Sequence, residues 1–185
     1  MVIVRFFNTI GPRQTGQYGM VVPRFVQQAL RGGPLTVYGD GQQTRCFTDV
    51  RDAVSAMTRL MATPPAMGQT FNIGNSREIT IENLARMVIQ MTCSSASIRY
   101  LPYEQVYSQG FEDMRRRVPD VSKLQAAIGC VPTIPLERAL ESIIRHFQSP
   151  QPGMARSLRG QRPAVSPSRD WQQHPSLSVA GSDGR

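Results

Sequence analysis

A short apolar run opens onto a polar loop almost at the first residue of this chain, and this feature constrains the fold most. Residues 2–7 are apolar, with β-branched and aromatic members, which predicts a buried strand. Asn8, Gly11, Pro12 and Arg13 follow directly. Proteins of the α/β class place ligand-binding groups where a sheet strand ends in such a loop. Because the strand has nothing before it in the sequence, we expect the chain to correspond to the second half of a larger fold.

Helical and strand periodicities alternate through the first 147 residues. Apolar spacing predicts helices around residues 22–30, 53–61, 81–89 and 135–147, with a shorter helix between 120 and 129. Short strands are expected at 36–38, 46–50, 70–73 and 97–101. Alternating elements predict an α/β protein, in which only two or three strands are long enough for a parallel sheet.

The last part of the chain differs in composition. Residues 148–185 are rich in Ser, Pro, Gln, Gly and Arg and contain few large apolar side chains. Such a segment cannot bury enough apolar surface to offset its ordering entropy. We therefore expect a globular part at 1–147 and a disordered Pro/Ser/Arg-rich tail at 148–185.

Charge and composition exclude several classes of function. The chain has 185 residues and a formal charge of +8, with Lys123 as the only lysine among 21 basic residues. These residues are spread over body and tail, which argues against a nucleic-acid partner. No apolar run approaches the roughly 18 residues of a membrane span. Cys46, Cys93 and Cys130 are widely spaced and only two histidines are present, so we expect reduced thiols, a cytoplasmic location and no metal site.

Two arginine-containing loops could hold phosphate. Residues 38–45 form a glycine-rich loop that ends in Arg45, and residues 113–120 contain three adjacent arginines before Pro119. The planar guanidinium group suits a diphosphate because it can bind two oxygens at once. Composition alone favours the plainer interpretation, in which these are turns with solvated arginines.

The chain does not contain the motifs of a complete hydride-transfer enzyme. A dinucleotide needs a glycine-rich turn between a strand and a helix, and the closest approach is Gly16–Gly19, with Arg13 where another glycine would stand. A Tyr-x-x-x-Lys pair is excluded, because the only lysine is Lys123 and Pro119 stands four residues before it. We therefore expect this chain alone to be inactive, and we assign it no catalytic residue.

Several motifs, in order, resemble a known family. They resemble the carboxy-terminal part of the extended short-chain dehydrogenase/reductases that act on nucleotide sugars, the NAD-dependent epimerase/dehydratase family. The resemblance covers about residues 2–147 and implies an incomplete Rossmann-like fold that lacks the amino-terminal dinucleotide-binding half but retains the small substrate-binding lobe. The matching segments are Arg5–Arg13, Leu35–Gly41, Gln43–Arg45, Asp49–Ala53, Phe71–Gly74, Arg117–Asp120 with Lys123, and Ile128–Pro132.

The resemblance also implies a nucleotide-sugar site. Its substrate-binding residues would be Asn8, Val22, Arg24, Thr36, Val37, Tyr38, Arg45 and Arg117. By resemblance, Asn8 would bind the diphosphate, which Arg45 and Arg117 would clamp. The first helix would flank the nucleotide, residues 36–38 would line a uracil pocket, and Phe7 would lie near the nicotinamide of NAD.

The reaction is less well specified than the family. The segment Gly110–Met114, with no additional catalytic pair visible, favours the nucleotide-sugar-binding part of an NAD-dependent UDP-sugar 4-epimerase. The alternatives are part of a UDP-glucuronate decarboxylase or dTDP-glucose 4,6-dehydratase, or a non-catalytic UDP-sugar-binding module. The resemblance further implies a UDP-sugar or related nucleotide sugar as ligand and a homodimeric parent enzyme.

Overall fold

The computed structural model describes residues 1–16, 20–105 and 114–149. Contacts along the chain divide it into Met1–Pro150 and Gln151–Arg185. The predicted disordered tail lies outside the described residues, apart from Gln148 and Ser149. No helix among the described residues is long and apolar enough to span a membrane.

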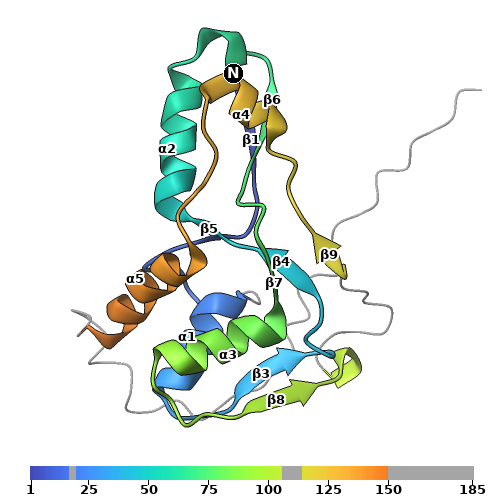
Figure 1. Cartoon of the computed structure of the whole chain (residues 1–185), viewed down its shortest axis with the longest axis vertical. Coiled ribbons are helices and arrows are strands. Elements are labelled where there is room, and N and C mark those ends of the chain that lie inside the picture. Colours follow the sequence, from blue (N-terminus) through green and yellow to red (C-terminus); the bar gives the residue numbers. More distant parts are fainter. Residues whose placement is uncertain (17–19, 106–113, 150–185) are drawn as a thin grey trace, which may run out of the picture. The chain divides into compact units, whose positions relative to one another are not determined.

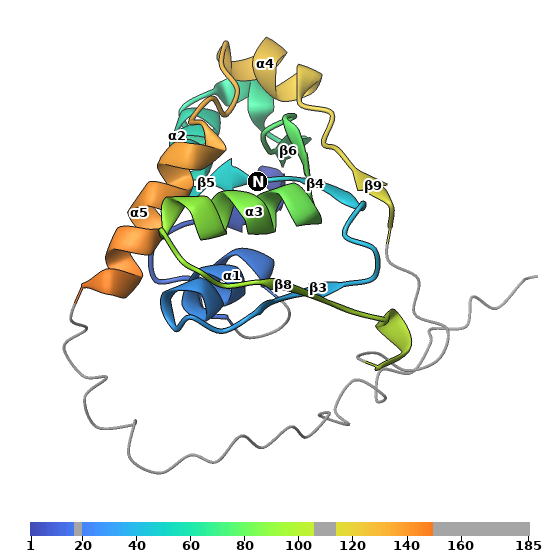
Figure 2. The same cartoon turned by 60° about the horizontal axis from the view of Figure 1, so that its bottom comes forward.

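One group of elements, which we call the cavity lobe, is built from three helices and a strand pair. The helices are α1 (Val21–Leu30), α3 (Ile81–Met91) and α5 (Leu136–Gln148). The strands β3 (Leu35–Tyr38) and β8 (Ile98–Leu101) run parallel. Helix α1 contacts α3, α5 and β3, so the lobe shares one core (Figures 1 and 2).

The helices of this lobe form where periodicity predicts them. In α3, Leu84, Ala85 and Val88 are fully buried on one face. The hydroxyl of Thr80 accepts a hydrogen bond from the Asn83 amide at 3.1 Å and so caps the first turn of α3.

A second group of elements, the β1 region, is built around another parallel strand pair. Strand β1 (Ile3–Phe6) pairs with β6 (Thr70–Ile73), next to helices α2 (Val50–Met61) and α4 (Ser122–Ile128) and the short 3₁₀ helix η1 (Pro64–Ala66) (Figure 1). Its small core contains Ala56, Leu60, Phe71, Ile73 and Leu124.

The prediction of a buried first strand is wrong for most of β1. Ile3 is 46% exposed and Phe6 is 44% exposed. The strand has the apolar composition of a sheet interior, but within the described part of the chain it pairs on one side only, with β6. An apolar composition is therefore not enough to bury a strand. Its side chains become fully buried only when other elements cover both faces of the sheet to which it belongs.

Short strands join the two groups. Strand β2 (Thr9–Ile10) runs parallel to β5 (Thr48–Asp49). Strand β4 (Thr44–Cys46) lies between antiparallel β7 (Glu78–Thr80) and parallel β9 (Arg116–Arg117). Hydrophobic periodicity did not predict β2, β7 or β9, since two or three residues are too few to show a period. A 3₁₀ turn, η2 (Tyr103–Gln105), follows β8.

Candidate functional site

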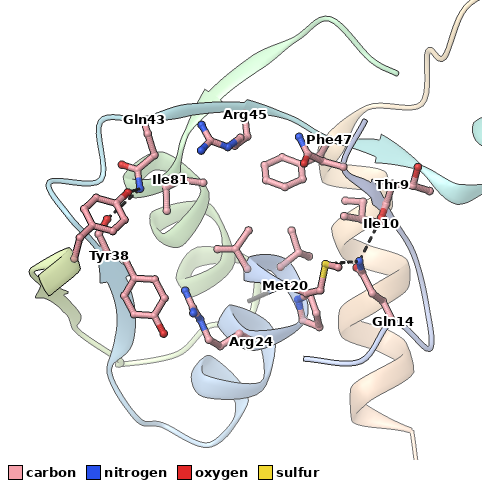
Figure 3. A pocket seen from close by; sticks show the side chains of 15 residues that line it. Thr9, Ile10, Gln14, Met20, Arg24, Tyr38, Gln43, Arg45, Phe47 and Ile81 are labelled. Atoms are coloured by element: carbon pink, nitrogen blue, oxygen red, sulfur yellow. Dashed lines mark hydrogen bonds between the residues drawn. The ribbon is translucent and has the colours of Figure 1, made fainter. Parts of the chain in front are cut away.

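A cavity of about 240 Å³ lies beside the first turn of α1, where the β1–β2 loop, β3 and β4 meet. Figure 3 shows the side chains around it. The residues that line it are Asn8, Thr9, Ile10, Gln14, Met20, Val21, Val22, Pro23, Arg24, Tyr38, Gln43, Arg45, Phe47, Ile81 and Tyr103.

The structure brings together more than half of the residues that the family resemblance indicated. Asn8, Val22, Arg24, Tyr38 and Arg45 all line this cavity, although they lie on four separate segments of the chain. The other predicted site residues, Phe7, Thr36, Val37 and Arg117, do not line it.

Those four residues have other surroundings. Val37 is fully buried in the core of the cavity lobe. Thr36 is held by the Gln28 side chain, which accepts from the Thr36 amide and donates to its hydroxyl, both at 3.1 Å. The Arg117 guanidinium carbon lies 5.3 Å from the centre of the Phe7 ring.

The backbone of the neighbouring segment helps to place Arg45. Its Nη1 donates to the carbonyl oxygens of Thr44 and Met114, each at 2.7 Å. Arg45 and Arg117 are register partners on the parallel strands β4 and β9. The two predicted phosphate-binding arginines are therefore adjacent, but only Arg45 reaches the cavity.

The cavity is lined by cations and by no acid. Arg24 and Arg45 are its charged residues, and no Asp or Glu is among the lining residues that the structure describes. Arg24 Nη2 donates to the Thr36 carbonyl at 3.1 Å, and its guanidinium carbon lies 4.2 Å from the centre of the Tyr38 ring. Figure 3 shows Arg24 and Arg45 on opposite sides of the cavity. An anionic group in this cavity would therefore meet positive charge from two sides.

Two hydrogen bonds hold Asn8 in place at the edge of the cavity. Its φ of 41° is in the left-handed region, which Asn tolerates better than most residues. Its Nδ2 donates to the Cys46 carbonyl at 2.8 Å, and its own carbonyl accepts from the Thr48 amide at 3.2 Å. Cys46 itself is buried, and desolvation raises the pKa of its thiol, which keeps the thiol protonated at neutral pH.

Several polar atoms around the cavity are buried without a protein hydrogen-bond partner. Within the described chain these include Thr9 Oγ1, Gln14 Oε1 and Gln43 Oε1, and all three residues line the cavity. Leaving such an atom unsatisfied costs about 1–3 kcal/mol. These atoms are almost inaccessible from the cavity, so a ligand would pair with them only after neighbouring side chains had moved.

Gln14, Gln43 and Tyr103 were not predicted as site residues. Gln43 stands in the polar loop singled out from the sequence, but nothing in its spacing distinguishes it from Gln42. Its orientation depends on Tyr103, which is 60 residues away in the sequence.

An ion pair between Asp49 and Arg51 stands at the start of α2. Asp49 is 2% exposed and begins α2, where its Oδ1 accepts from the backbone amide and Nε of Arg51, each at 2.8 Å. Burial alone would raise the pKa of Asp49, but these hydrogen bonds and the charge of Arg51 outweigh it and hold the pKa below 3.8. The carboxylate therefore stays ionised at neutral pH.

Comparison with known proteins agrees with the sequence motifs. Residues 1–74 match the model of the NAD dependent epimerase/dehydratase family. The chain is 44% identical over 149 residues to UDP-N-acetyl-alpha-D-glucosaminuronate decarboxylase of Bacillus cytotoxicus, which covers 80% of this chain and 46% of the relative. It is 38% identical over 146 residues to UDP-glucuronic acid decarboxylase 1 of Xenopus tropicalis, covering 79% of this chain and 33% of the relative.

Solved structures extend the comparison to the fold. The UDP-glucuronic acid 4-epimerase from Bacillus cereus, in complex with UDP-glucuronic acid and NAD, superposes with a TM-score of 0.70 at 28% identity, covering 79% of this chain and 44% of that one. The chain thus has an α/β fold of the Rossmann-like epimerase/dehydratase class. Its resemblance to the NAD-dependent epimerase/dehydratase family is confirmed. The chain spans less than half the length of the relatives named here.

Proposed function

We propose that this chain binds a nucleoside diphosphate sugar, most simply a UDP-sugar, in the cavity beside α1. The observation that carries the proposal is the cavity's lining, which holds two arginines and no acid among its described residues. A diphosphate supplies the negative charge that Arg24 and Arg45 would balance.

The orientation of the ligand follows from where these groups lie. Arg45, next to Phe47 and on the strand whose Cys46 carbonyl holds Asn8, is the proposed diphosphate ligand. Tyr38 and Gln43 lie together at one end of the cavity, whereas Thr9 and Gln14 lie at the other (Figure 3). We place the base at the Tyr38 end and sugar hydroxyls at the Thr9 end.

The named relatives support a uronic acid as the sugar. Two are decarboxylases of a UDP-glucuronic or UDP-N-acetylglucosaminuronic acid, and the third is a 4-epimerase of UDP-glucuronic acid. Their names share a UDP-linked sugar acid but not a reaction. The two decarboxylases favour decarboxylation over the 4-epimerase reaction for an enzyme that contains this chain.

NAD is the cofactor that the family resemblance implies, and the Bacillus cereus epimerase was solved with it. The described residues do not fit a complete NAD site. The sequence provides no glycine-rich dinucleotide turn, and Phe7, the proposed nicotinamide contact, has Arg117 over its ring and lies outside the cavity. We therefore derive no hydride-transfer step for this chain and propose that it contributes the nucleotide-sugar-binding part of such an enzyme.

Calorimetric titration tests the proposed function directly. We expect the purified chain to bind UDP and UDP-glucuronic acid but not uridine, because the diphosphate supplies the charge that Arg45 meets. Arg45→Ala should weaken UDP binding about 10- to 100-fold, since a hydrogen bond to a charged group contributes about 1.5–3 kcal/mol.

The matched control is Arg138→Ala. Arg138 lies on α5, its side chain is 70% exposed, and it does not line the cavity. Its removal should leave UDP affinity unchanged. Equal affinities of the two variants for UDP would show that the diphosphate does not bind at Arg45.

A further inference from the structure

Thr48 is a completely buried polar residue between two strand ends. It begins β5, which lies between the cavity lobe and the β1 region (Figure 1), and 0% of it is exposed. Its hydroxyl donates a hydrogen bond to the Phe7 carbonyl at 3.0 Å and accepts one from the Asn75 amide at 2.9 Å. The single hydrogen of the hydroxyl is thereby used, and Thr48 does not line the cavity.

The Thr48 hydroxyl takes the place of a hydrogen bond between β1 and β6. These strands run parallel, and the pairing continues past β1, since the Phe7 amide donates to the Ile73 carbonyl at 3.0 Å. In a regular parallel pair, the Asn75 amide would next donate directly to the Phe7 carbonyl. The hydroxyl stands between these two groups instead, so the chain leaves β6 at Phe7 and turns towards β5.

The Thr48 backbone holds the residue that follows. Its amide donates to the Asn8 carbonyl at 3.2 Å. The Phe7 and Asn8 carbonyls belong to the two peptide groups that flank the Asn8 Cα, and each peptide group is a rigid plane. Because Thr48 holds both planes, it determines the backbone dihedral angles of Asn8.

These angles decide where the Asn8 side chain lies. A φ of 41° is uncommon for a residue with a side chain and persists only where the surroundings impose it. In this conformation Nδ2 donates to the carbonyl of Cys46, the residue after Arg45, at 2.8 Å. Asn8 is partly exposed and lines the cavity, and Nδ2 carries a second hydrogen that is available to a ligand.

We infer that Thr48 is a positioning residue, which holds Asn8 in the conformation that binds the diphosphate of the nucleotide. The inference rests on the proposed nucleotide-sugar site and adds to it a residue that does not touch the ligand. Without the hydroxyl, the Asn75 amide can bond directly to the Phe7 carbonyl. That bond would draw the peptide group before Asn8 towards β6 and move the Asn8 side chain away from Arg45.

Calorimetric titration of the full chain with UDP tests the role of the hydroxyl. Thr48→Val keeps the shape of the side chain but removes the hydroxyl, and should weaken UDP binding about tenfold. Thr48→Ser keeps the hydroxyl and should remain within about threefold of the wild type. The matched control is Thr92→Val, which removes a hydroxyl that donates to the Val88 carbonyl at the end of α3, away from the cavity lining, and should leave UDP affinity unchanged.

A double-mutant cycle shows whether Thr48 acts through Asn8. Asn8→Gly removes the side chain but tolerates the left-handed backbone, and should itself weaken UDP binding about tenfold. In the Asn8→Gly chain, Thr48→Val should change UDP affinity by less than about twofold, because the side chain that it positions is already gone. Additive losses, or an unchanged UDP affinity in Asn8→Gly, would overturn the inference.

Arg45→Ala separates this inference from the proposed function. If Arg45→Ala weakens UDP binding while Thr48→Val binds UDP as the wild type does, the diphosphate site stands and the role of Thr48 is refuted. If the wild-type chain does not bind UDP, the proposed function and the inference both fail.

A second pair of variants decides the question should Thr48→Val fail to fold by circular dichroism. Thr48→Cys and Thr48→Ser have side chains of similar shape, but a thiol is a much weaker hydrogen-bond donor than a hydroxyl. Weaker UDP binding by Thr48→Cys than by Thr48→Ser would support the inference, and equal affinities would refute it.

Discussion

The cavity lobe and the β1 region use apolar residues of the same kinds in different ways. In the cavity lobe, large side chains such as Phe25 and Leu35 are completely buried. In the β1 region, Ile3 and Phe6 of β1 are nearly half exposed. Both regions contain a pair of parallel strands next to helices, so the kind of secondary structure does not explain the difference.

Helix α2 shows where the difference comes from. One of its faces packs Ala53, Ala56 and Leu60 into the small core of the β1 region. Val54 and Met61 point elsewhere and are 51% and 83% exposed. The helices of the cavity lobe have a single apolar face, and the lobe buries it. The cavity lobe is therefore the better packed part of the described chain, and with α1 and β3 it supplies one side of the ligand cavity.

The same substitution in each region should have very different effects on stability. Phe25→Ala removes a fully buried ring from the cavity lobe and should lower the free energy of unfolding by about 3–5 kcal/mol. Phe6→Ala removes a ring that is 44% exposed and should cost about 1–2 kcal/mol, because less apolar surface leaves contact and solvent can fill the space. Urea unfolding followed by circular dichroism measures both. Equal losses would mean that the two regions share one evenly packed core.

A second prediction concerns Asp49, which links the two regions through β5 and α2. Its pKa is lower in the folded chain than the ordinary value of 3.8, so folding favours the ionised carboxylate. The resulting stabilisation is fully present above that ordinary value and is lost as the pH falls through the lower folded value. Asp49→Asn keeps an N-cap but removes the charge, and should cost about 1–2 kcal/mol at pH 7.

The pH dependence distinguishes this effect from simple loss of packing. The difference in unfolding free energy between the wild type and Asp49→Asn should stay constant from about pH 7 to about pH 4 and shrink as the pH is lowered further, to about 2. A constant difference across that range would show that the carboxylate charge contributes nothing and that the substitution acts through shape. Arg51 is 58% exposed, which keeps the expected effect modest.

The fold followed from the sequence wherever one long element carries its own signal. Helices α1, α3 and α5 have the predicted faces, since about three turns or more repeat the same apolar spacing. The exposure of β1 could not be read this way. The apolar pattern of a sequence indicates which side chains tend to be buried. Whether a strand is in fact buried depends on which other elements cover it.

Only some residues of the site could be predicted from the sequence. Motifs carried by the family resemblance indicated Asn8, Arg24, Tyr38 and Arg45, and the structure places all of these around the cavity. Gln43 was not predicted because its place beside the cavity depends on a hydrogen bond to Tyr103, which is 60 residues away. Such a tertiary contact is not visible in a linear sequence.

The smallest expected effect is a charge placed on the exposed face of α2. Met61→Lys changes a side chain that is 83% exposed, so little apolar contact is lost and the free energy of unfolding should shift by no more than about 0.5 kcal/mol. Met61 is the last residue of α2, where a positive charge also interacts favourably with the helix dipole. The neighbouring Leu60→Lys is the matched control: Leu60 is 1% exposed, and burying an ammonium group there should destabilise the chain by more than about 3 kcal/mol. Thermal unfolding of both variants measures the contrast, and a large loss in Met61→Lys would show that this face of α2 is covered in solution.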